Sequence, residues 1–148
     1  MHDPTGRVFR LCPAGRLNCL ISNGPSPNGL VLSPDEAVLF VAMMRDNSIW
    51  RVPLMRDSGV AKVGWFSLFF GTSGPDGLTM DQKGRLFVAH ASLGHVFVIA
   101  PNGETIARIK SCVGATCTNL VLEAANGTLL ITESSTGSVL MADLAHLP

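Results

Sequence analysis

The sequence predicts an all-β protein built from repeated antiparallel units, and two observations lead to this prediction. One pattern of apolar runs and polar turns recurs three times, and no stretch carries a sustained helical period. The copies read NGLVLSPDEAVLFVA from Asn28, DGLTMDQKGRLFVA from Asp76 and TNLVLEAANGTLLIT from Thr118. The aligned leucines of successive copies are 48 and 42 residues apart, so one unit is about 45 residues long.

Each unit opens with two short apolar strands joined by a turn, and a third strand follows. Apolar runs of this length are typical of strands buried on both faces. The turns contain Pro, Gly, Asp and Asn, which favour reversal of the chain. Third strands are predicted at 48–52, 95–99 and 138–142, a fourth at 103–109, a weaker fourth at 65–70, and two N-terminal strands at 6–11 and 15–21.

These thirteen strands predict a β-propeller, because four strands in about 45 residues form one propeller blade. We expect a single half-propeller domain over 1–148, with blade-like units at about 1–22 (partial), 28–70, 76–110 and 118–144. The chain supplies about three four-stranded blades, whereas closed propellers have about four to eight. Either two copies complete a six-bladed ring as a homodimer, or the chain is a truncated gene product.

The composition argues against several classes of partner. The formal net charge is zero and no Lys/Arg cluster is present, so we expect no nucleic-acid partner. No apolar run reaches the ~18 residues of a membrane span, and the N-terminus does not resemble a signal peptide, so a cytoplasmic protein with no membrane partner is expected. The four cysteines form no C-x-x-C pair, which argues against a cysteine-based zinc site. They are expected to be free thiols, unless export allows Cys112 to pair with Cys117.

An ordered set of motifs resembles the SMP-30, gluconolactonase and luciferin-regenerating enzyme family. The matching stretches are PNGL at 27–30 with SPD at 33–35, SIWR at 48–51, GPDGL at 74–78, GRLFVA at 84–89, and Thr118-Asn119 before Thr132-Glu133. They cover nearly the whole chain and correspond to the C-terminal half of that family. The resemblance implies a six-bladed propeller that holds a divalent cation in its central channel. The cation is most often calcium and sometimes zinc, and the reactions are hydrolysis of lactones or phosphoesters.

The resemblance also implies a metal ligand at Asn28, and a metal ligand and catalytic base at Asp76. A further acidic ligand, a Glu, is expected in the half that this chain lacks. Independently, Asn28, Asp76 and Thr118 each begin a first strand, and first strands line a propeller channel. Their oxygen atoms are therefore expected to converge, as a hard cation requires. The alternatives are Asn-Gly and Asp-Gly turns. Asn119 is a third metal candidate, or a cap at the start of a strand.

Four polar residues lie where second strands end. His90 follows RLFVA, Arg45 and Asp46 occupy the matching exit of the first copy, and Glu133 follows LLIT. We expect His90, Asp46 and Arg45 to contact substrate, with Glu133 as a further candidate. The alternatives are a structural histidine and solvated charges.

Two functions remain open. The first is a metal-dependent lactonase-like hydrolase acting on a small-molecule lactone or ester, in which the metal polarises the carbonyl and Asp76 activates water. The second is a non-catalytic half-propeller, a binding or assembly module that has lost part of its metal site.

Overall fold

The computed structural model describes residues 6–56, 59–123 and 127–147 of the 148-residue chain. It contains thirteen strands in four antiparallel sheets of two, four, four and three strands, in the order that the sequence predicts. The sheets are β1 (Gly6–Leu11) and β2 (Leu17–Gly24); β3 (Pro27–Leu32), β4 (Val38–Met43), β5 (Ser48–Pro53) and β6 (Gly64–Leu68); β7 (Pro75–Met80), β8 (Leu86–His90), β9 (His95–Ile99) and β10 (Thr105–Lys110); and β11 (Cys117–Glu123), β12 (Thr128–Glu133) and β13 (Ser138–Asp143).

Two details differ from the predicted elements. A single turn of 3-10 helix, η1 (Met44–Asp46), joins β4 to β5 and ends at Asn47, whose φ of 51° is left-handed. Asparagine tolerates the left-handed conformation at residue 47 because its short polar side chain can hydrogen-bond locally. The strand predicted at 65–70 is β6, which ends at Leu68, so Phe69 and Phe70 lie beyond the sheet.

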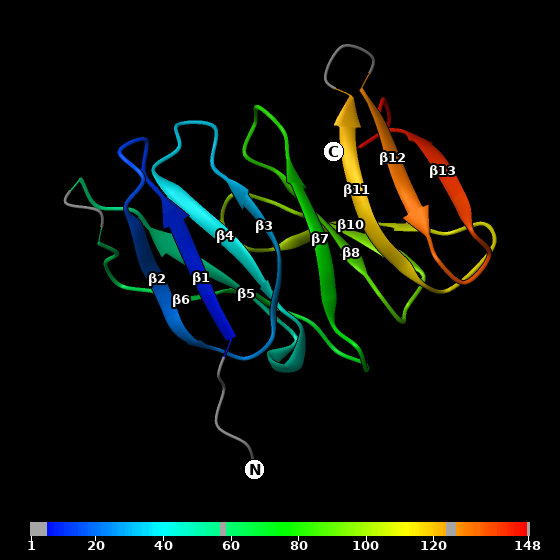
Figure 1. Ribbon diagram of the computed structural model, residues 1–148. Coiled ribbons are helices and arrows are strands. Elements are labelled where there is room, and N and C mark those ends of the chain that lie inside the picture. Colours follow the sequence, from blue (N-terminus) through cyan, green and yellow to red (C-terminus); the bar gives the residue numbers. More distant parts are fainter. Residues whose placement is uncertain (1–5, 57–58, 124–126, 148) are drawn as a thin grey trace.

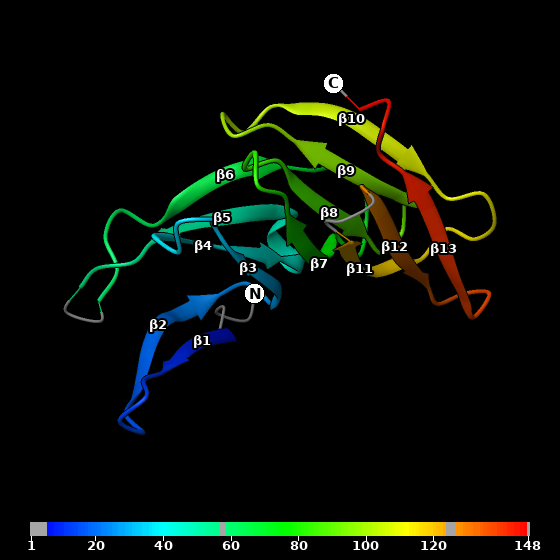
Figure 2. The ribbon, with the colours of Figure 1, turned by 90° about the horizontal axis from the view of Figure 1, so that it is seen from above.

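The four sheets follow one another in an arc (Figure 2). The first strands β3, β7 and β11 lie side by side on the inner side of the arc and face the viewer in Figure 1. The outer strands β6 and β10 lie on the opposite side. This arrangement places the starts of β3, β7 and β11 next to one another.

Three apolar clusters lie between neighbouring sheets. Strand β8 contributes to two of them, since Leu86 and Val88 point toward β4 and β5 whereas Phe87 and Ala89 point toward β11 and β12. All four side chains are fully buried, which confirms that this run is a strand buried on both faces. The third cluster joins β1 and β2 to β4 and β5 through residues such as Ile21.

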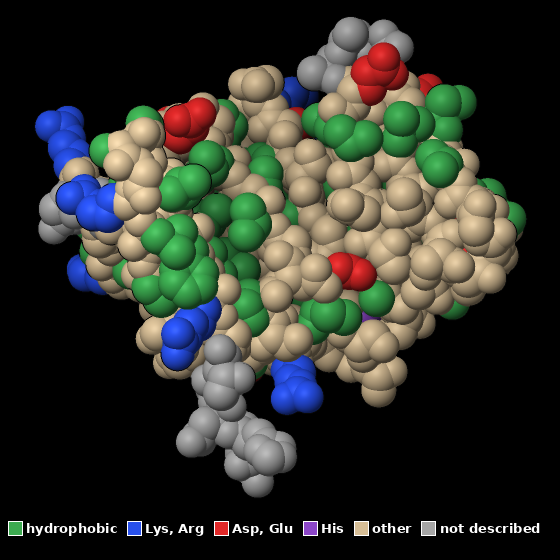
Figure 3. Space-filling model, viewed as in Figure 1, with side chains coloured by type: hydrophobic (Ala, Val, Ile, Leu, Met, Phe, Trp, Pro, Cys, Tyr) green, Lys and Arg blue, Asp and Glu red, His purple; other side chains and the backbone are tan. Residues whose placement is uncertain are grey.

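Large apolar side chains remain exposed at both ends of the arc. Figure 3 shows hydrophobic side chains gathered over β1, β2 and β3. The residues involved there include Phe9, Leu11, Leu17, Leu30 and Leu32, while Val121, Val139 and Met141 are exposed on the last sheet. Exposed apolar side chains that cluster often mark contacts with other protein, so both end faces are suited to covering by further protein.

The only helix among residues 6–56, 59–123 and 127–147 has three residues, far too few to cross a membrane. All four cysteines, which lie within these ranges, are free; Cys117 is buried, whereas Cys19 and Cys112 are exposed.

Candidate functional site

The starts of the three inner strands share one irregularity, a β-bulge. In β3, Pro27 pairs with Met43 but Leu30 pairs with Val41, so β3 has one residue more than its partner. The same extra residue occurs between Pro75 and Leu78 in β7, and between Cys117 and Asn119 in β11. Bulges bend a strand and re-aim its side chains, and they are frequent next to active sites. They affect the segments that carry Asn28, Asp76 and Thr118.

Two glycines let these segments pack backbone against backbone. A Cβ atom on Gly29 would overlap the main-chain carbonyl oxygen of Asp76 and lie 2.8 Å from the Cα of Gly77. A Cβ atom on Gly77 would lie 2.7 Å from the Cα of Asn119 and 2.9 Å from the carbonyl oxygen of Thr118. Both glycines are inside strands, so the Asn-Gly and Asp-Gly pairs are not turns. They allow close approach of neighbouring inner strands.

Asn28 and Asp76 each keep an oxygen donor without a protein partner. The Asn28 amide nitrogen donates to the Met44 sulfur at 3.0 Å, and its amide oxygen accepts no hydrogen bond from the described chain. The Asp76 carboxylate likewise has no hydrogen bond or ion pair to any residue of the described ranges. Burial raises the pKa of Asp76 above the usual 3.8, because the charged form is partly desolvated.

The third inner strand differs from the first two. In its register, Thr118 takes the place of Asn28 and Asp76, and Asn119 takes the place of the glycines. The Thr118 hydroxyl lies 3.0 Å from the Thr132 hydroxyl. The Asn119 side-chain oxygen packs against Gly77 and accepts the Leu120 N–H at 2.8 Å. This side chain therefore already serves the contact between β7 and β11.

His90 is the last residue of β8, and it is fully buried. Its ring lies 5.8 Å from that of Phe97 and 6.1 Å from that of Phe69 between centroids. Its Nε2 lies 3.3 Å from the Asn47 side-chain oxygen. The Asn47 amide nitrogen donates to the Gly71 carbonyl, which fixes the orientation of the amide. The Asn47 oxygen is therefore the acceptor and the His90 Nε2–H is the donor. Burial lowers the pKa of His90 below its usual value of 6.5, so the ring is neutral at physiological pH. Its Nδ1 is buried and has no hydrogen-bond partner in the described part of the chain.

Arg45 and Asp46, both in η1, have different surroundings. The Asp46 carboxylate accepts hydrogen bonds from the Ser48 hydroxyl at 2.7 Å and from the indole N–H groups of Trp50 and Trp65 at 3.1 and 2.9 Å. Burial opposes its ionisation, but these three donors outweigh burial and lower the pKa of Asp46. Asp46 thus holds two tryptophans, whereas Arg45 is exposed.

Glu133 is the buried acid whose role the sequence did not reveal. It is 1% exposed, and its carboxylate accepts the main-chain N–H of Thr116 at 2.8 Å, both donors of Ser135, and both donors of Thr136. The hydroxyl groups of Ser135 and Thr136 are the largest cause that lowers the pKa of Glu133 to about 2. The signal in the sequence is E-S-S-T, an acid followed by hydroxyl residues that can fold back onto it.

The donor set at the inner strands comprises one carboxylate and one amide oxygen. No group of three or more His, Cys, Asp or Glu side chains that could hold a metal ion occurs within the part of the chain that the structure describes. Asn28 and Asp76 offer hard oxygen donors of the kind that calcium prefers, although calcium takes six to eight of them. These two residues can form only part of a coordination sphere.

Comparison with known proteins identifies the family. Residues 1–135 match the SMP-30/Gluconolactonase/LRE-like region. This chain belongs to that family. The gluconolactonase of Zymomonas mobilis is 34% identical over 136 residues, which cover 86% of this chain and 38% of the relative. Lactonase drp35 of Staphylococcus aureus is 33% identical over 114 residues, or 72% of this chain and 34% of the relative. This chain therefore spans little more than a third of the length of these relatives.

Solved structures agree on the fold. The gluconolactonase XC5397 from Xanthomonas campestris superposes with a TM-score of 0.79 at 27% identity, over 96% of this chain and 44% of its own. Regucalcin from Agrobacterium tumefaciens superposes with a TM-score of 0.80 at 22% identity, over 95% of this chain and 52% of its own. The all-β fold of this SMP-30/gluconolactonase family chain is thus propeller-like, and the chain corresponds to about half of each of these structures.

Proposed function

We propose that this chain forms part of a metal-dependent lactonase-like hydrolase, with Asn28 and Asp76 as metal ligands and Asp76 as the base that activates water. The observation that carries the proposal is the packing of Gly29 against Asp76, which brings two bulged strands together where their oxygen donors are unpartnered. Membership of the family and the lactonase relatives support a small-molecule lactone or ester as substrate.

The chemistry of the two donors fits a divalent cation. The Asp76 carboxylate is half-buried with no neutralising partner in the described chain, and its pKa is raised, so a nearby cation would compensate its charge. The amide oxygen of Asn28 adds a neutral hard donor. We favour calcium over zinc, because zinc prefers nitrogen and sulfur ligands. Regucalcin, which shares the fold, is described as a calcium-binding protein. Asn119 is a weaker candidate, since its oxygen already accepts a hydrogen bond.

A bound cation would supply Lewis-acid polarisation of the lactone carbonyl. The residues of this chain would do the rest. Asp76 would accept a proton from the attacking water, and a cation bound beside it would keep its carboxylate ionised and so able to take that proton. Arg45 is exposed in η1, near the Met44 that contacts Asn28, and is the remaining candidate for substrate contact. In this proposal the buried His90 and the tryptophan-bound Asp46 shape the site instead of touching substrate.

We propose that two copies form a six-bladed ring, with about three blades from each. The half-length match to XC5397 and the exposed apolar end faces support this arrangement. In this arrangement the strand predicted at 15–21, which is β2, is exchanged between copies and completes the partner's last blade. Because β2 pairs with β1 within the chain, β1 must leave that pair; otherwise β11–β13 joined to β1–β2 would make a five-stranded sheet. The proposal also includes a cytoplasmic location. It divides the chain into blade-like units at about 1–22, 28–70, 76–110 and 118–144.

The second candidate function is a non-catalytic half-propeller that binds or assembles. The observation that favours it is the incomplete donor set, with a single carboxylate at the inner strand starts. In that case calcium would bind weakly or not at all, while the end faces would still pair.

Calcium titration and light scattering test these proposals together. We expect calcium to raise the melting temperature of the wild type, because a ligand that binds only the folded state stabilises it, and Asp76→Asn to abolish the rise. Asp143→Asn, at the exposed end of β13, is the matched control and should retain it. Turnover of an aldonolactone should require calcium and Asp76. A mass near 15.7 kDa for the chain in solution would exclude the dimer. Equal calcium affinity in wild type and Asp76→Asn would remove Asp76 from the site.

A further inference from the structure

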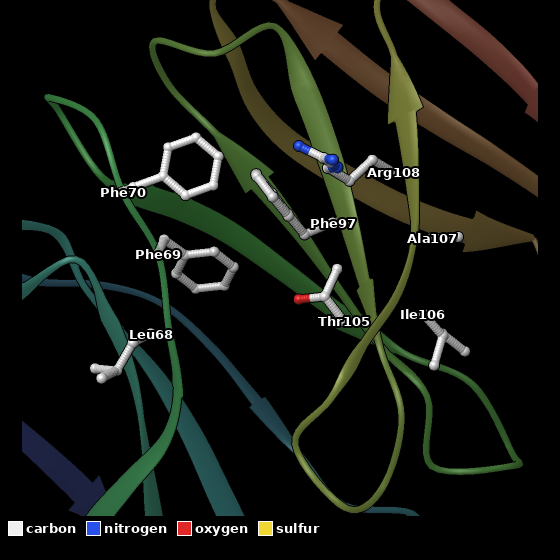
Figure 4. Close-up of a pocket in the computed structure, with 8 residues that line it drawn as sticks. All are labelled: Leu68, Phe69, Phe70, Phe97, Thr105, Ile106, Ala107 and Arg108. Carbon is white, nitrogen blue, oxygen red and sulfur yellow. The ribbon is translucent and has the colours of Figure 1, made fainter.

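A groove of about 390 Å³ lies between the outer strands of two neighbouring sheets, away from the inner strands that carry Asn28 and Asp76. It separates the end of β6 from β9 and β10 (Figure 4). Its lining consists of Leu68, Phe69, Phe70, Phe97, Thr105, Ile106, Ala107 and Arg108. Six of these eight residues are apolar, and pockets of this volume that combine apolar side chains with a few polar groups are typical of small-molecule sites.

One wall of the groove is aromatic. The ring of Phe97 lies 5.0 Å from that of Phe69 and 6.3 Å from that of Phe70, and both pairs are edge-to-face. Phe70 is nonetheless 60% exposed, because the chain has left β6 before this residue. An aromatic ring that entered the groove could extend this edge-to-face cluster and cover Phe70.

Next to the aromatic rings, the groove carries a positive charge. Arg108 in β10 is paired in register with Phe97 in β9, so both side chains lie on the same face of the sheet. Figure 4 shows the Arg108 guanidinium above Phe97 on the side of Phe70, with the Thr105 hydroxyl facing the same space and Ala107 pointing away. No acidic side chain within the described ranges forms an ion pair with Arg108. A guanidinium beside aromatic rings suits a carboxylate, which it can bind through two parallel hydrogen bonds.

The turn between β9 and β10 touches β6 next to the groove. A Cβ atom on Gly103 would lie 2.6 Å from the Phe66 carbonyl oxygen, so the two sheets meet at this point.

We propose that this groove binds a small aromatic carboxylic acid, with its ring against Phe69, Phe70 and Phe97 and its carboxylate on Arg108. The proposal assigns a second ligand site, remote from the inner strands and independent of any metal. It does not rest on the hydrolase activity.

The test uses the full chain and 2-naphthoate, with 2-naphthamide as the uncharged probe of the same shape. Titration by calorimetry should show one naphthoate bound per chain and at least about tenfold weaker binding of the amide. Arg108→Gln should make the two affinities equal. Phe70→Ala should weaken both probes, because it removes the ring contact. Lys110→Gln, which removes another exposed cation of β10, should change neither.

Circular dichroism of each variant checks the fold, and Asp76→Asn separates the two sites, since it should leave naphthoate binding unchanged. Absence of saturable naphthoate binding at millimolar concentration would overturn the proposal. So would a preference for the acid that survives in Arg108→Gln, or an equal loss of binding in Lys110→Gln.

Discussion

Gly29 lies against the main-chain carbonyl oxygen of Asp76, so two inner strands touch where each carries a candidate ligand. The contact depends on the absence of a side chain at residue 29. Gly77 makes the equivalent contact with Asn119 on the next strand. The spacing of the inner strands is thus set by residues adjacent to the donors.

Replacing Gly29 by alanine should separate β3 from β7. The added Cβ would meet backbone atoms, which cannot rotate away, so we expect a loss of about 1–3 kcal/mol in the free energy of unfolding, the usual range for overpacking. Urea denaturation measures this loss. Gly64→Ala is the control, because nothing lies within 4 Å of a Cβ there, and it should change stability by less than about 0.5 kcal/mol. Equal stability of Gly29→Ala and wild type would show that the strands can separate without loss.

Asp76→Asn should stabilise the chain at neutral pH when divalent cations are chelated. Burial raises the pKa of Asp76 in the folded state, so the unfolded chain releases this proton more readily and stability falls as the pH rises through the carboxyl range. The gain from Asn should therefore grow with pH and be absent below the usual pKa of 3.8. Thermal unfolding in EDTA from pH 3 to 8 measures it. Asp143→Asn, which removes an exposed carboxylate of β13, is the matched control for the loss of one negative charge.

The fold could be predicted from sequence because strand runs and turns are local patterns. The thirteen strands, their grouping and the buried nature of β8 all follow from runs such as RLFVA and from turn residues between them. The inner-strand bulges could not be predicted, since an extra residue appears only when both strands of a pair are known. For this reason Asn28-Gly29 and Asp76-Gly77 also fitted turns.

The roles of the residues at second-strand ends were harder to predict. His90 and Glu133 occupy equivalent places, but one is surrounded by Phe69 and Phe97 and the other by Ser135, Thr136 and Thr116. Phe69 follows β6, which belongs to a different sheet from β8, so no local sequence pattern indicates its contact with His90. The Glu133 partners are close in sequence, but their hydroxyl groups could equally have faced solvent.

Acid should destabilise the chain partly through His90. Its pKa is lower in the folded state than in the unfolded chain, so unfolding takes up a proton and the free energy of unfolding falls as the pH drops below about 6.5. We expect His90→Gln, which keeps a donor for Asn47, to reduce this fall between pH 6.5 and 5. Denaturant midpoints across that range measure it. His146→Gln, which replaces an exposed histidine, is the matched control. A fall of the same size in His90→Gln would mean that other groups cause it.

Glu133→Gln should release the loop that precedes β11. The carboxylate accepts donors from Thr116, Ser135 and Thr136, and glutamine offers one oxygen where the acid offers two. The pKa of Glu133 is about 2 when folded and 4.5 ordinarily, so its stabilisation is complete above pH 4.5 and is lost as the pH falls toward 2. The variant should therefore melt at a lower temperature than wild type at pH 7, with the difference shrinking below pH 4.5.

Release of the loop should also lower the pKa of the Cys117 thiol, which burial and the Glu133 charge raise. Alkylation of this thiol at pH 8 should therefore be faster in the variant than in wild type. Glu123→Gln, on the exposed end of β11, is the control for both measurements. Identical melting at pH 7 and unchanged alkylation in Glu133→Gln would show that the main-chain turns alone hold the loop.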